Sequence, residues 1–511
     1  FFVVARRSLF FGRSLKASKM TPEKRIAEDE ATGQEAKRLK EDTDDAVEEN
    51  ADNNEDQKEE NADNEEQKAA TEETTQEDNN SQDSAASSSD TDSKSVVPLS
   101  QECGLLVLSG CVQWNLIGRR NQKPAASMQH FAPRRVKAFA DIKVVAVASH
   151  CSAAHAVIIT QEGKVWTMGR NEKGQLGVGD CDDHAGPKQL ESLSDVVIVA
   201  AACGRNHTLF LSNMGIVYAC GDNKSGQCGV GNNSALILTP QKIDFKDAKI
   251  LKVACGAEFS MIVDKRGYLY SFGCPEYGQL GHNTDGKYFV TSNKLSFQFE
   301  TSPRRIPVFV ECNKGGHPSA VPDVQIVDVA CGNNHTVVLD SKKRAYAWGF
   351  GGYGRLGHAE PKDEMIPRLI KFFDGHNRGV LKIFSGGSFT IANTELGVYL
   401  WGQTKRTGEA NMYPKPIQDL YGWNVRSIGC SVTSIVIAAD DTVIAWGPSP
   451  TYGELGLGDN IKSSTTPEEC KLLNGVYVHQ VTCSAGFTLY VARNDSEQDK
   501  TLLAKLKEIT V

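Results

Sequence analysis

The stretch CGRNHTLFL, residues 203–211, places Cys203 and His207 four residues apart. A thiolate and an imidazole at this spacing could supply two ligands of a zinc ion, or a nucleophile with its general base. Structural zinc sites are built from ligand pairs such as Cys-x2-Cys. None of the fourteen cysteines forms such a pair. Whether this stretch does chemistry or supports a fold therefore depends on the rest of the chain.

The same stretch recurs along the chain, which indicates an internal repeat. Its copies begin at Cys151, Cys203, Cys255, Cys331, Ser385, Cys430 and Cys483. The intervals between them are 52, 52, 76, 54, 45 and 53 residues. The first six copies continue into a second half that resembles WG…GQLG, whereas the seventh breaks off. The missing second half is found at the other end of the repeat region, as LLVLSGCVQWNLIG at 105–118.

Each unit predicts about four short strands, because apolar or alternating runs of four to six residues are separated by turn residues such as SNMG and DKRG. Four strands in roughly 50 residues are typical of one blade of a β-propeller. The sequence therefore predicts an all-β, seven-bladed propeller over 101–494. Strands at 105–118 complete the last blade, and this closure removes free sheet edges.

The repeat changes the interpretation of the cysteines and histidines. Serine replaces cysteine at 385, which favours a small buried packing position over a metal ligand. The histidine position holds His155, His207, Phe259, His335, Phe389, Ser434 and Phe487. Since the blade does not require an imidazole there, we expect a local hydrogen-bonding role. The GQLG glycines recur at one turn and lack the Lys-Ser/Thr of a phosphate loop. We expect no catalytic residue, no metal and no cofactor.

The repeat CGRNHTLFL…GDNKSGQCGVG and its copies resemble the regulator-of-chromosome-condensation family, over residues 101–494. The resemblance implies a non-catalytic interaction protein of cell division that binds Rho- or Ras-like small GTPases and chromosome, centromere or spindle components. It implies a location in the nucleus, on chromosomes and on the mitotic spindle, with a cytoplasmic pool. Two alternatives stay open. One is a guanine nucleotide exchange factor, acting without covalent chemistry as the family's founding member does. The other is a chromatin-binding module without a GTPase role.

The resemblance also suggests which residues contact a partner, because the family's GTPase-facing surface is similar in placement to the CGxxH loops. His335 in CGNNHT matches a functional histidine and Glu258 in CGAEF matches an acidic one. The two variable letters of each loop are the expected specificity positions. The predicted partner-binding residues are Arg205, Asn206, Glu258, Asn334 and His335. Two departures put exchange on the founder's own GTPase in doubt: Phe487 stands where a second histidine is expected, and no wedge is recognisable at 231–249.

Two stretches exceed the repeat and are predicted to be insertions, at 119–143 and 284–325. The first carries seven cations and one aspartate: Arg119, Arg120, Lys123, Arg134, Arg135, Lys137 and Lys143. Such a concentration predicts contact with nucleic-acid phosphate through 119–137, with an acidic protein face, or with the chain's own acidic segment. A merely solvated loop is the alternative. The second insertion contains SPRR, which makes Ser302 a candidate phosphosite.

The segments outside the repeats differ from it in composition. Residues 41–100 hold 21 acidic side chains and three lysines, and aromatics are absent from 21–100, so 20–100 is predicted to be a disordered acidic tail. Residues 1–19 carry five basic residues and no acid. They are either a mitochondrial targeting segment or an extension upstream of a natural start at Met20. Residues 495–511 are a C-terminal extension, in which KTLLAKLKEITV at 500–511 is predicted to form a short exposed helix. We expect a monomer without a transmembrane segment.

Overall fold

The computed structural model describes residues 97–119, 122–184, 186–313, 315–405, 407–447 and 452–511. The chain divides into two units, Phe1–Ser87 and Ser88–Val511, and every described residue belongs to the second. The predictions for 1–19 and for nearly all of 20–100 thus fall outside the described residues. No helix in the described part has the length and apolar character needed to cross a membrane.

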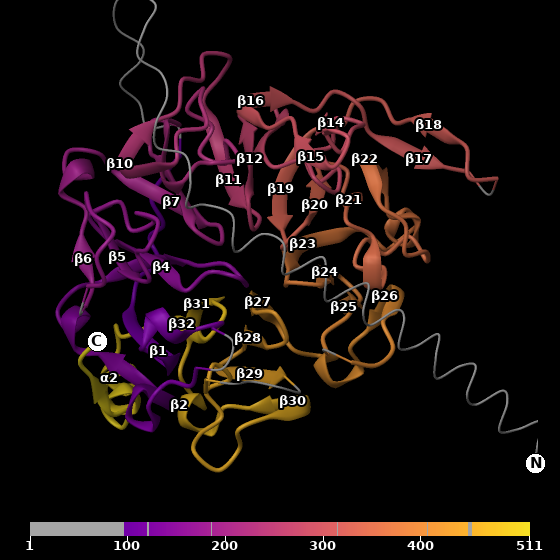
Figure 1. Cartoon of the computed structure of the whole chain (residues 1–511). Helices are drawn as coiled ribbons and strands as arrows, with labels where there is room; N and C mark the ends of the chain where they lie inside the picture. Colours follow the sequence, from indigo (N-terminus) through magenta and orange to yellow (C-terminus); the bar gives the residue numbers. More distant parts are fainter. Residues whose placement is uncertain (1–96, 120–121, 185, 314, 406, 448–451) are drawn as a thin grey trace, which may run out of the picture. The chain divides into compact units, whose positions relative to one another are not determined.

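Seven sheets radiate from a common axis as the blades of a propeller (Figure 1). The innermost strands are β3 (Val144–Ala148), β7 (Ile198–Cys203), β11 (Ile250–Cys255), β19 (Ile326–Cys331), β23 (Val380–Ser385), β27 (Val425–Cys430) and β31 (Val478–Cys483). Each ends at or near the repeated cysteine or serine. The cysteine position of the sequence repeat is therefore a position at the end of the strand that lines the axis.

The second and third strands of each blade form its buried middle. The second strands are β4 (His155–Thr160), β8 (His207–Ser212), β12 (Phe259–Asp264), β20 (His335–Asp340), β24 (Phe389–Thr394), β28 (Ile435–Ala439) and β32 (Phe487–Ala492). The third strands are β5 (Val165–Gly169), β9 (Val217–Asp222), β13 (Leu269–Gly273), β21 (Ala345–Gly349), β25 (Gly397–Gly402), β29 (Thr442–Gly447) and β1 (Leu105–Cys111). Both faces of these strands pack against neighbouring blades, which explains why runs such as HTLFLS are buried at every position.

The fourth strand of each blade is more polar and half exposed. These strands are β6 (Lys188–Gln189), β10 (Leu236–Lys242), β16 (Glu300–Arg305), β22 (Glu364–Leu369), β26 (Asn411–Pro416), β30 (Ser464–Glu469) and β2 (Gln129–Val136). Short 3-10 turns follow five of them and each buries one large apolar side chain. These turns are η3 (Lys137–Phe139), η4 (Glu191–Leu193), η6 (Lys371–Phe373), η7 (Gln418–Leu420) and η8 (Lys471–Leu473). The turns fill the wedge between neighbouring blades near the rim.

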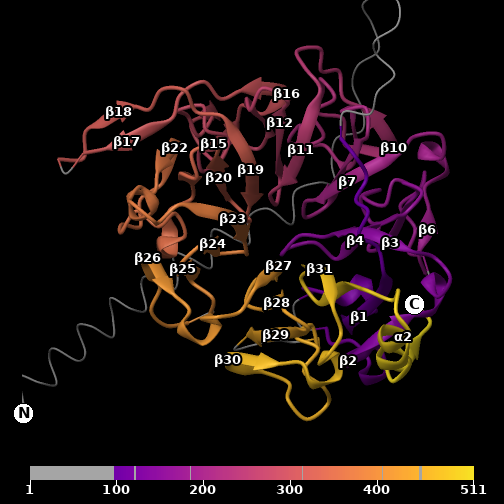
Figure 2. The same cartoon turned by 180° about the vertical axis from the view of Figure 1, so that it is seen from behind.

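The ring closes as the sequence predicts. Strand β1 pairs antiparallel with β32 through six residue pairs, from Leu105–Ala492 to Gly110–Phe487, and with β2 on its other edge. Figure 2 shows β1 and β2 beside β31, although more than 300 residues separate them in sequence. A side-chain hydrogen bond of 2.9 Å between Ser109 and Tyr490 lies within this seam. The all-β, seven-bladed architecture is thus confirmed.

The C-terminal segment extends the closing blade further. Helix α2 (Glu497–Ala504) begins at a capping box, in which Ser496 Oγ accepts the Asp499 N–H and the Asp499 carboxylate accepts the Ser496 N–H. Strand β33 (Glu508–Ile509) then pairs in parallel with β2 as a fifth strand. Leu503, Leu506 and Ile509 are buried. The predicted helix is present over part of 500–511, but its predicted exposure is wrong, because its apolar residues pack onto the blade.

The two predicted insertions contain more regular structure than a loop. Residues 119–143 include η2 (Ala126–Met128) and the whole of β2, which is the outer strand of the closing blade. Residues 284–325 include the hairpin β14 (Lys287–Thr291) and β15 (Lys294–Phe297), the outer strand β16, and the pair β17 (Val310–Cys312) and β18 (Pro318–Ala320). The last pair widens the neighbouring blade to six strands. Part of each stretch therefore belongs to the repeat itself.

Candidate partner-binding face

The CGxxH loops gather at one end of the propeller because each joins an innermost strand to the second strand of its blade. Neighbouring loops are tied together by backbone hydrogen bonds. The Arg205 N–H donates to the Ala257 carbonyl over 3.0 Å, and the Ala257 N–H donates to the Asn333 carbonyl over 3.0 Å. Ala485 donates to Ala153 across the closing seam over 2.9 Å. The loops thus form a rigid surface around the axis, which we call the CGxxH face.

Two of the predicted partner-binding residues meet on this face. Arg205 Nη1 donates to Glu258 Oε1 over 2.9 Å, from one blade to the next. The two side chains remain 47% and 44% exposed. An ion pair this exposed contributes about 0–1 kcal/mol. The pair therefore adds little to the fold and its charges are available to a partner.

Asn206 and Asn334 hold equivalent places in the loops of two blades, and both are half-buried. The Asn206 carbonyl accepts the Asp222 N–H over 2.8 Å, and the Asn334 carbonyl accepts the Phe350 N–H over 2.8 Å. These bonds fix the loop against the end of the third strand. The backbone of both predicted residues is consequently held by the fold while part of each residue reaches solvent.

His335 is fully buried, in contrast to the other predicted contact residues. Its Nε2 lies 3.0 Å from Thr390 Oγ1 in the next blade, and that hydroxyl donates to the Arg355 carbonyl over 3.0 Å. His207, Ser260 and the Gln227 carbonyl form the same column two blades away, with distances of 2.9 and 2.8 Å. His335 thus positions its loop, because its Nε2 is already engaged with Thr390 Oγ1 of the next blade.

Burial also sets the ionisation of these histidines. It lowers the pKa of His155 and of His207 to about 3, and it lowers the pKa of His335 well below the usual value. The imidazoles are neutral near pH 7 and act as hydrogen-bonding struts between blades. The local, structural role expected for the histidine position is therefore what the geometry shows.

Where glycine follows the repeated cysteine, it is needed because the ring of the residue at the histidine position packs directly against its Cα. A Cβ at Gly332 would stand 2.1 Å from His335 Cε1, and one at Gly256 would stand 1.9 Å from Phe259 Cε1. No side chain fits into that space. The letters C, G and H of the repeat are thus explained by packing at the inner end of the loop.

The repeated cysteines behave as packing residues. Cys203 Sγ donates to the Ala148 carbonyl and Cys255 Sγ donates to the Ala202 carbonyl, each over 3.5 Å and each from one blade to the preceding one. Burial raises the pKa of Cys151, Cys255 and Cys483 to about 12, so the thiols stay protonated. They line an axial cavity of about 330 Å³. Among the described residues, no three His, Cys, Asp or Glu side chains are placed to hold a metal ion.

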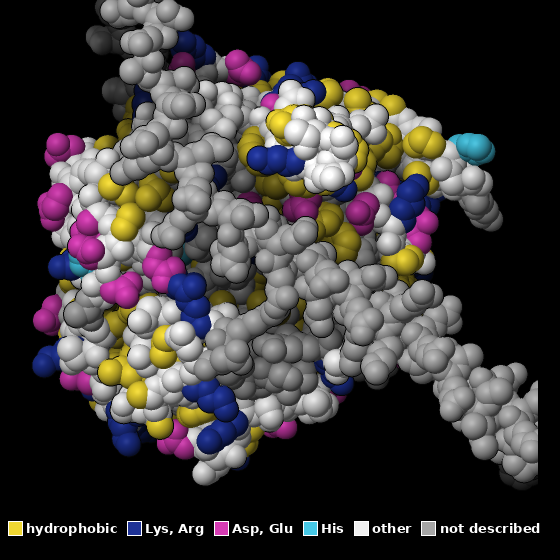
Figure 3. Space-filling model, viewed as in Figure 1, with side chains coloured by type: hydrophobic (Ala, Val, Ile, Leu, Met, Phe, Trp, Pro, Cys, Tyr) yellow, Lys and Arg dark blue, Asp and Glu magenta, His cyan; other side chains and the backbone are white. Residues whose placement is uncertain are grey.

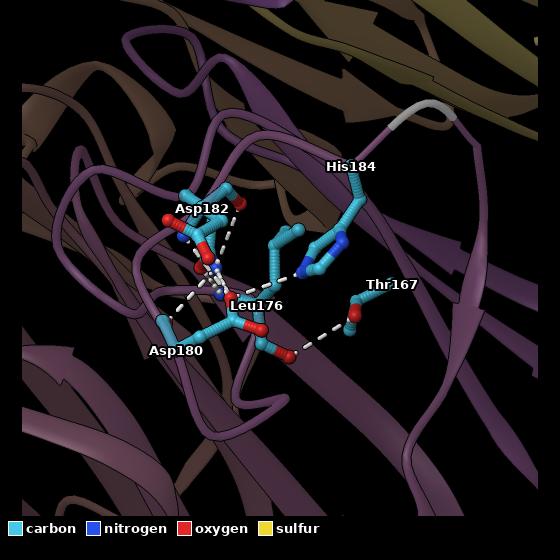
Figure 4. A network of polar contacts seen from close by, with 6 residues as sticks. Thr167, Leu176, Asp180, Asp182 and His184 are labelled. Atoms are coloured by element: carbon cyan, nitrogen blue, oxygen red, sulfur yellow. Dashed lines mark hydrogen bonds and ion pairs between the residues drawn. The ribbon is translucent and has the colours of Figure 1, made fainter.

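One polar network that the sequence analysis did not single out has the residue types of a metal or acid–base site. Asp180, Asp182 and His184 converge near Leu176 in the first blade (Figure 4). His184 Nε2 lies 3.0 Å from Asp180 Oδ1, which also accepts a hydrogen bond of 2.9 Å from Asn171 Nδ2. The next blade repeats the arrangement without any acid or histidine, using Asn223, Asn232 and Ser234. The network therefore holds together the two ends of the loop between Asn171 and Asp180.

Three of the seven basic residues of 119–143 are engaged in ion pairs. Arg119 pairs with Glu172, Arg135 with Glu508 over 3.3 Å, and Lys143 with Asp495 over 3.0 Å. Lys123 and Lys137 are exposed, Arg134 is half-buried, and Arg120 lies outside the described residues. Lysine and arginine side chains are scattered among acidic ones over the visible face (Figure 3). Contact between this stretch and nucleic acid stays a prediction.

Ser302 lies on the outermost strand β16 and is exposed, beside an irregularity in the pairing of β16 with β13. Arg304 pairs with Glu300, and Arg305 stacks over Tyr268 at 3.6 Å. A kinase would therefore meet an extended and accessible serine, and the phosphosite stays a prediction. Residues 231–249, the expected place of a wedge, contain the outer strand β10, whose pairing with β9 shifts register between Ile237 and Gln241.

Sequence reasoning missed one residue of the CGxxH face. Arg355 stands in the turn GRLG where other blades have glutamine or glutamate, and it is only 4% exposed. Phe350 and Tyr353 lie against its guanidinium, at 4.5 and 5.7 Å from the ring centroids. The signal was present in the sequence as a change at one letter of an otherwise repeated turn.

The fold and this face define a class of protein: a seven-bladed β-propeller whose ring of repeated loops forms one continuous binding surface. The family model of the RCC1-like domain matches residues 102–490. The chain belongs to the RCC1-like domain family.

Relatives that share about half of the residues cover most of the chain. Protein RCC2 homolog of Danio rerio is 51% identical over 427 residues, which are 82% of this chain and 86% of the relative. Protein RCC2 of Homo sapiens is 50% identical over 413 residues, 79% of each chain. Within the family, the stretches at 169–177, 270–283, 348–369 and 446–456 resemble the second regulator of chromosome condensation, and these relatives confirm that resemblance.

Solved structures share the fold at low sequence identity. Yeast RCC1 (Prp20) bound to Kap60 superposes with a TM-score of 0.63 at 19% identity, covering 82% of this chain and 97% of that one. Prp20p from Saccharomyces cerevisiae, described with its binding properties to Gsp1p and histones, gives a TM-score of 0.61 at 18% identity and covers 80% and 95%. At such identity the likeness shows the propeller fold alone.

Proposed function

We propose that this protein is a non-catalytic interaction and regulatory propeller of cell division, which binds Rho- or Ras-like small GTPases through the CGxxH face. The observation that carries the proposal is the exposed Arg205–Glu258 pair on loops that the fold holds rigid. Charged groups that contribute little to stability, on a backbone already fixed, are suited to steering and specificity. Membership of the RCC1-like domain family and the RCC2 relatives support the assignment.

The location proposed for this activity is the nucleus, chromosomes, centromere and mitotic spindle, with a cytoplasmic pool. The relatives named RCC2 and the propeller fold shared with yeast RCC1 support a chromosome-associated role. Targeting to mitochondria would apply only if residues 1–19 act as a transit segment, and these lie outside the described residues.

The test is direct binding of the full chain to a panel of purified Rho- and Ras-type GTPases, each in its GDP-bound, GTP-analogue-bound and nucleotide-free form. We expect at least one member to bind, and the variant R205A/E258A to bind it at least tenfold more weakly. The matched control is K343A/E395A, which removes an equally exposed ion pair of 2.7 Å at the opposite end of the propeller. Absence of binding to every member, or equal loss in both double variants, would contradict the proposal.

A nucleotide-release assay with the same panel separates an interaction protein from an exchange factor. The stretch 231–249, the expected place of a wedge, contributes the outer strand β10 (Leu236–Lys242) to its own blade. We therefore expect nucleotide release at the intrinsic rate. Acceleration of release from any member would favour the exchange-factor alternative.

A second candidate function is contact with chromatin, which the exposed Lys123 and Lys137 favour. One of the structural neighbours is described as binding histones. Binding through phosphates would weaken steeply with salt. The test is binding to nucleosomes and to DNA between 50 and 200 mM salt, with the cations of 119–137 neutralised. An unchanged affinity in the neutralised variant would remove this candidate.

A further inference from the structure

The GQLG turn contains a recurring side-chain cap. At its second letter the side-chain oxygen accepts the backbone N–H of the residue two positions earlier. In four blades this bond runs from Lys173 to Gln175, from Ser225 to Gln227, from Tyr277 to Gln279 and from Tyr452 to Glu454, over 2.8, 2.9, 2.7 and 2.9 Å. Glutamine and glutamate are interchangeable here because both supply an acceptor oxygen.

Arg355 breaks this rule in the blade formed by β19–β22. A guanidinium has five N–H donors and no acceptor, so it cannot cap the turn. The residue two positions earlier, Tyr353, takes a left-handed conformation with φ 61° and is 51% exposed. A tyrosine in that region is strained, and such strain gathers at functional sites. The turn at Arg355 thus lacks the side-chain cap found in four other blades, and Tyr353 in the same turn has a strained backbone.

The guanidinium lies inside the face without a counter-ion. Arg355 Nε donates to the Gly352 carbonyl over 2.9 Å and Nη1 donates to the Gly387 carbonyl over 3.3 Å. Among the described residues no carboxylate forms an ion pair with it; Asp363 acts on its charge from a distance and accepts the Gly351 N–H over 2.7 Å instead. Burial lowers the pKa of Arg355 to about 10, so the group is still cationic at neutral pH. A charge held this way lacks the partner that buried ions ordinarily have.

Aromatic rings surround this cation. Phe350 and Tyr353 contact the guanidinium, and the Tyr277 ring lies 5.0 Å from the Phe350 ring, centroid to centroid. Tyrosine and arginine in such clusters are typical anchors of protein interfaces. The column that starts at His335 ends on the Arg355 carbonyl, through Thr390. The predicted functional histidine thus holds the backbone that carries this arginine.

A single carboxylate is the ligand that fits this environment best. Its two oxygens match the planar N–H fork of a guanidinium. A phosphate would also pair with arginine, but it carries more negative charge, and the loops nearby already contain Glu258 and Glu276.

We propose that Arg355, framed by Phe350 and Tyr353, receives an aspartate or glutamate side chain of the protein partner that docks on the CGxxH face. The partner supplies the counter-ion that the chain itself does not place there. The inference rests on the proposed function for the use of this face, and it names the chemistry by which the partner is recognised.

The test compares R355Q with wild type in the full chain. Glutamine stands at this position in three other blades and restores the cap, so R355Q should fold and unfold cooperatively. The control is R378Q, an exposed arginine that stacks on Phe372 at 5.3 Å at the opposite end of the propeller. Anisotropy with a fluorescein-labelled peptide of alternating glutamate and glycine measures carboxylate binding directly, and the glutamine–glycine peptide is the uncharged probe.

We expect R355Q to bind the glutamate peptide at least tenfold more weakly than wild type, R355K to be intermediate, and R378Q to match wild type. Any small GTPase retained by the wild type should show the same order. Equal binding of the glutamate peptide by wild type and R355Q, or no preference over the glutamine peptide, overturns the inference. Loss of the peptide in R355Q with no GTPase bound by any form leaves the carboxylate site standing and removes the proposed function instead.

Discussion

The inner and outer halves of the same CGxxH loop differ in almost every physical respect. The inner half, exemplified by Gly332 and His335, is buried, repeated and neutral. The outer half, exemplified by Arg205 and Glu258, is exposed, variable and charged. Within five residues, groups that hold the ring together thus stand directly beside groups that are free to meet a partner. A repeat protein can change its partner without changing its fold only because these halves are separate.

The largest expected effect is on the inner half. Replacement of Gly332 by alanine puts a Cβ 2.1 Å from His335 Cε1 and 2.6 Å from the Gly386 carbonyl oxygen. We expect the free energy of unfolding to fall by about 3 kcal/mol, from overpacking of a rigid core. The control is G375A on an exposed turn, where the new methyl meets only the flexible side chain of Arg378 at 3.3 Å. Urea unfolding measures both, and equal stabilities would contradict the packing argument.

Asp499 provides the next test. It lies in the C-terminal segment of α2 and β33, residues 497–509, which packs onto the closing blade and is called the C-terminal clasp below. Its carboxylate accepts hydrogen bonds from Arg493 and from the Ser496 N–H, and the Arg493 bond is the main cause that lowers the Asp499 pKa to about 2. We expect D499N to lose about 2 kcal/mol at pH 7, as for hydrogen bonds to charged groups. Asp495, which is 54% exposed and pairs with Lys143, is the matched control as D495N.

The pH dependence of the clasp follows from linkage. Because folding lowers the pKa of Asp499, its stabilisation is present above the unfolded pKa of about 3.9 and is lost as the pH falls towards about 2. The wild type should therefore lose its advantage over D499N on titration from pH 5 to pH 2. A constant difference across that range would contradict this account.

A smaller effect is expected for His207, which Phe replaces in three other blades. H207F keeps the ring but loses the bond to Ser260 Oγ, so we expect a loss of about 1 kcal/mol at pH 7.5. Burial lowers the pKa of His207 to about 3. Below about pH 6.5 this histidine is therefore protonated in the unfolded chain but stays neutral in the folded chain. Wild-type stability from this residue thus falls as the pH drops, and the deficit of H207F should narrow at pH 5.

The matched control for that experiment is H376F, since His376 is exposed. It should change stability little at either pH. A deficit of H207F that is the same at pH 7.5 and pH 5 would show that the imidazole is not held neutral by the fold.

The smallest effect on stability belongs to the outer half. R205A/E258A should change the free energy of unfolding by at most about 1 kcal/mol, because the pair is exposed. Its effect on partner affinity should nevertheless be at least tenfold, as stated above. A large loss of stability in this variant, measured by urea unfolding, would mean that the two halves of the loop are not separate.

The sequence predicted the architecture well because the repeat carries it. The periodic cysteine, glycine and histidine letters each mark one packing position, so comparing copies revealed the blades, and the half-repeat at 105–118 revealed the closure. The outer strands were harder to find, since strands such as β2 and β16 are polar, half exposed and irregular in their pairing. Without a buried face they lack the apolar pattern from which strands are inferred.

The candidate site was predicted unevenly for a related reason. The repeat places Arg205 and Glu258 on one face. Their contact also depends on the rotation of one blade relative to the next, and the repeat sequence does not reveal that angle. His335 looked functional by its match to the family, and only the structure shows that it points into the blade seam. Arg355 was overlooked because a change from glutamine to arginine looks conservative until the lost acceptor is recognised.

The closure of the ring has a consequence for how the chain is made. Ser109 and Tyr490, which bond across the seam, are 381 residues apart. At about 5–20 residues per second, the ribosome needs about 20 to 80 s to deliver the second after the first. During that interval β1, which is apolar, can pair with β2 on one edge, but the strand β32 for its other edge has not yet been made. We therefore expect LLVLSGC to be open to pairing with other strands until β32 has been made.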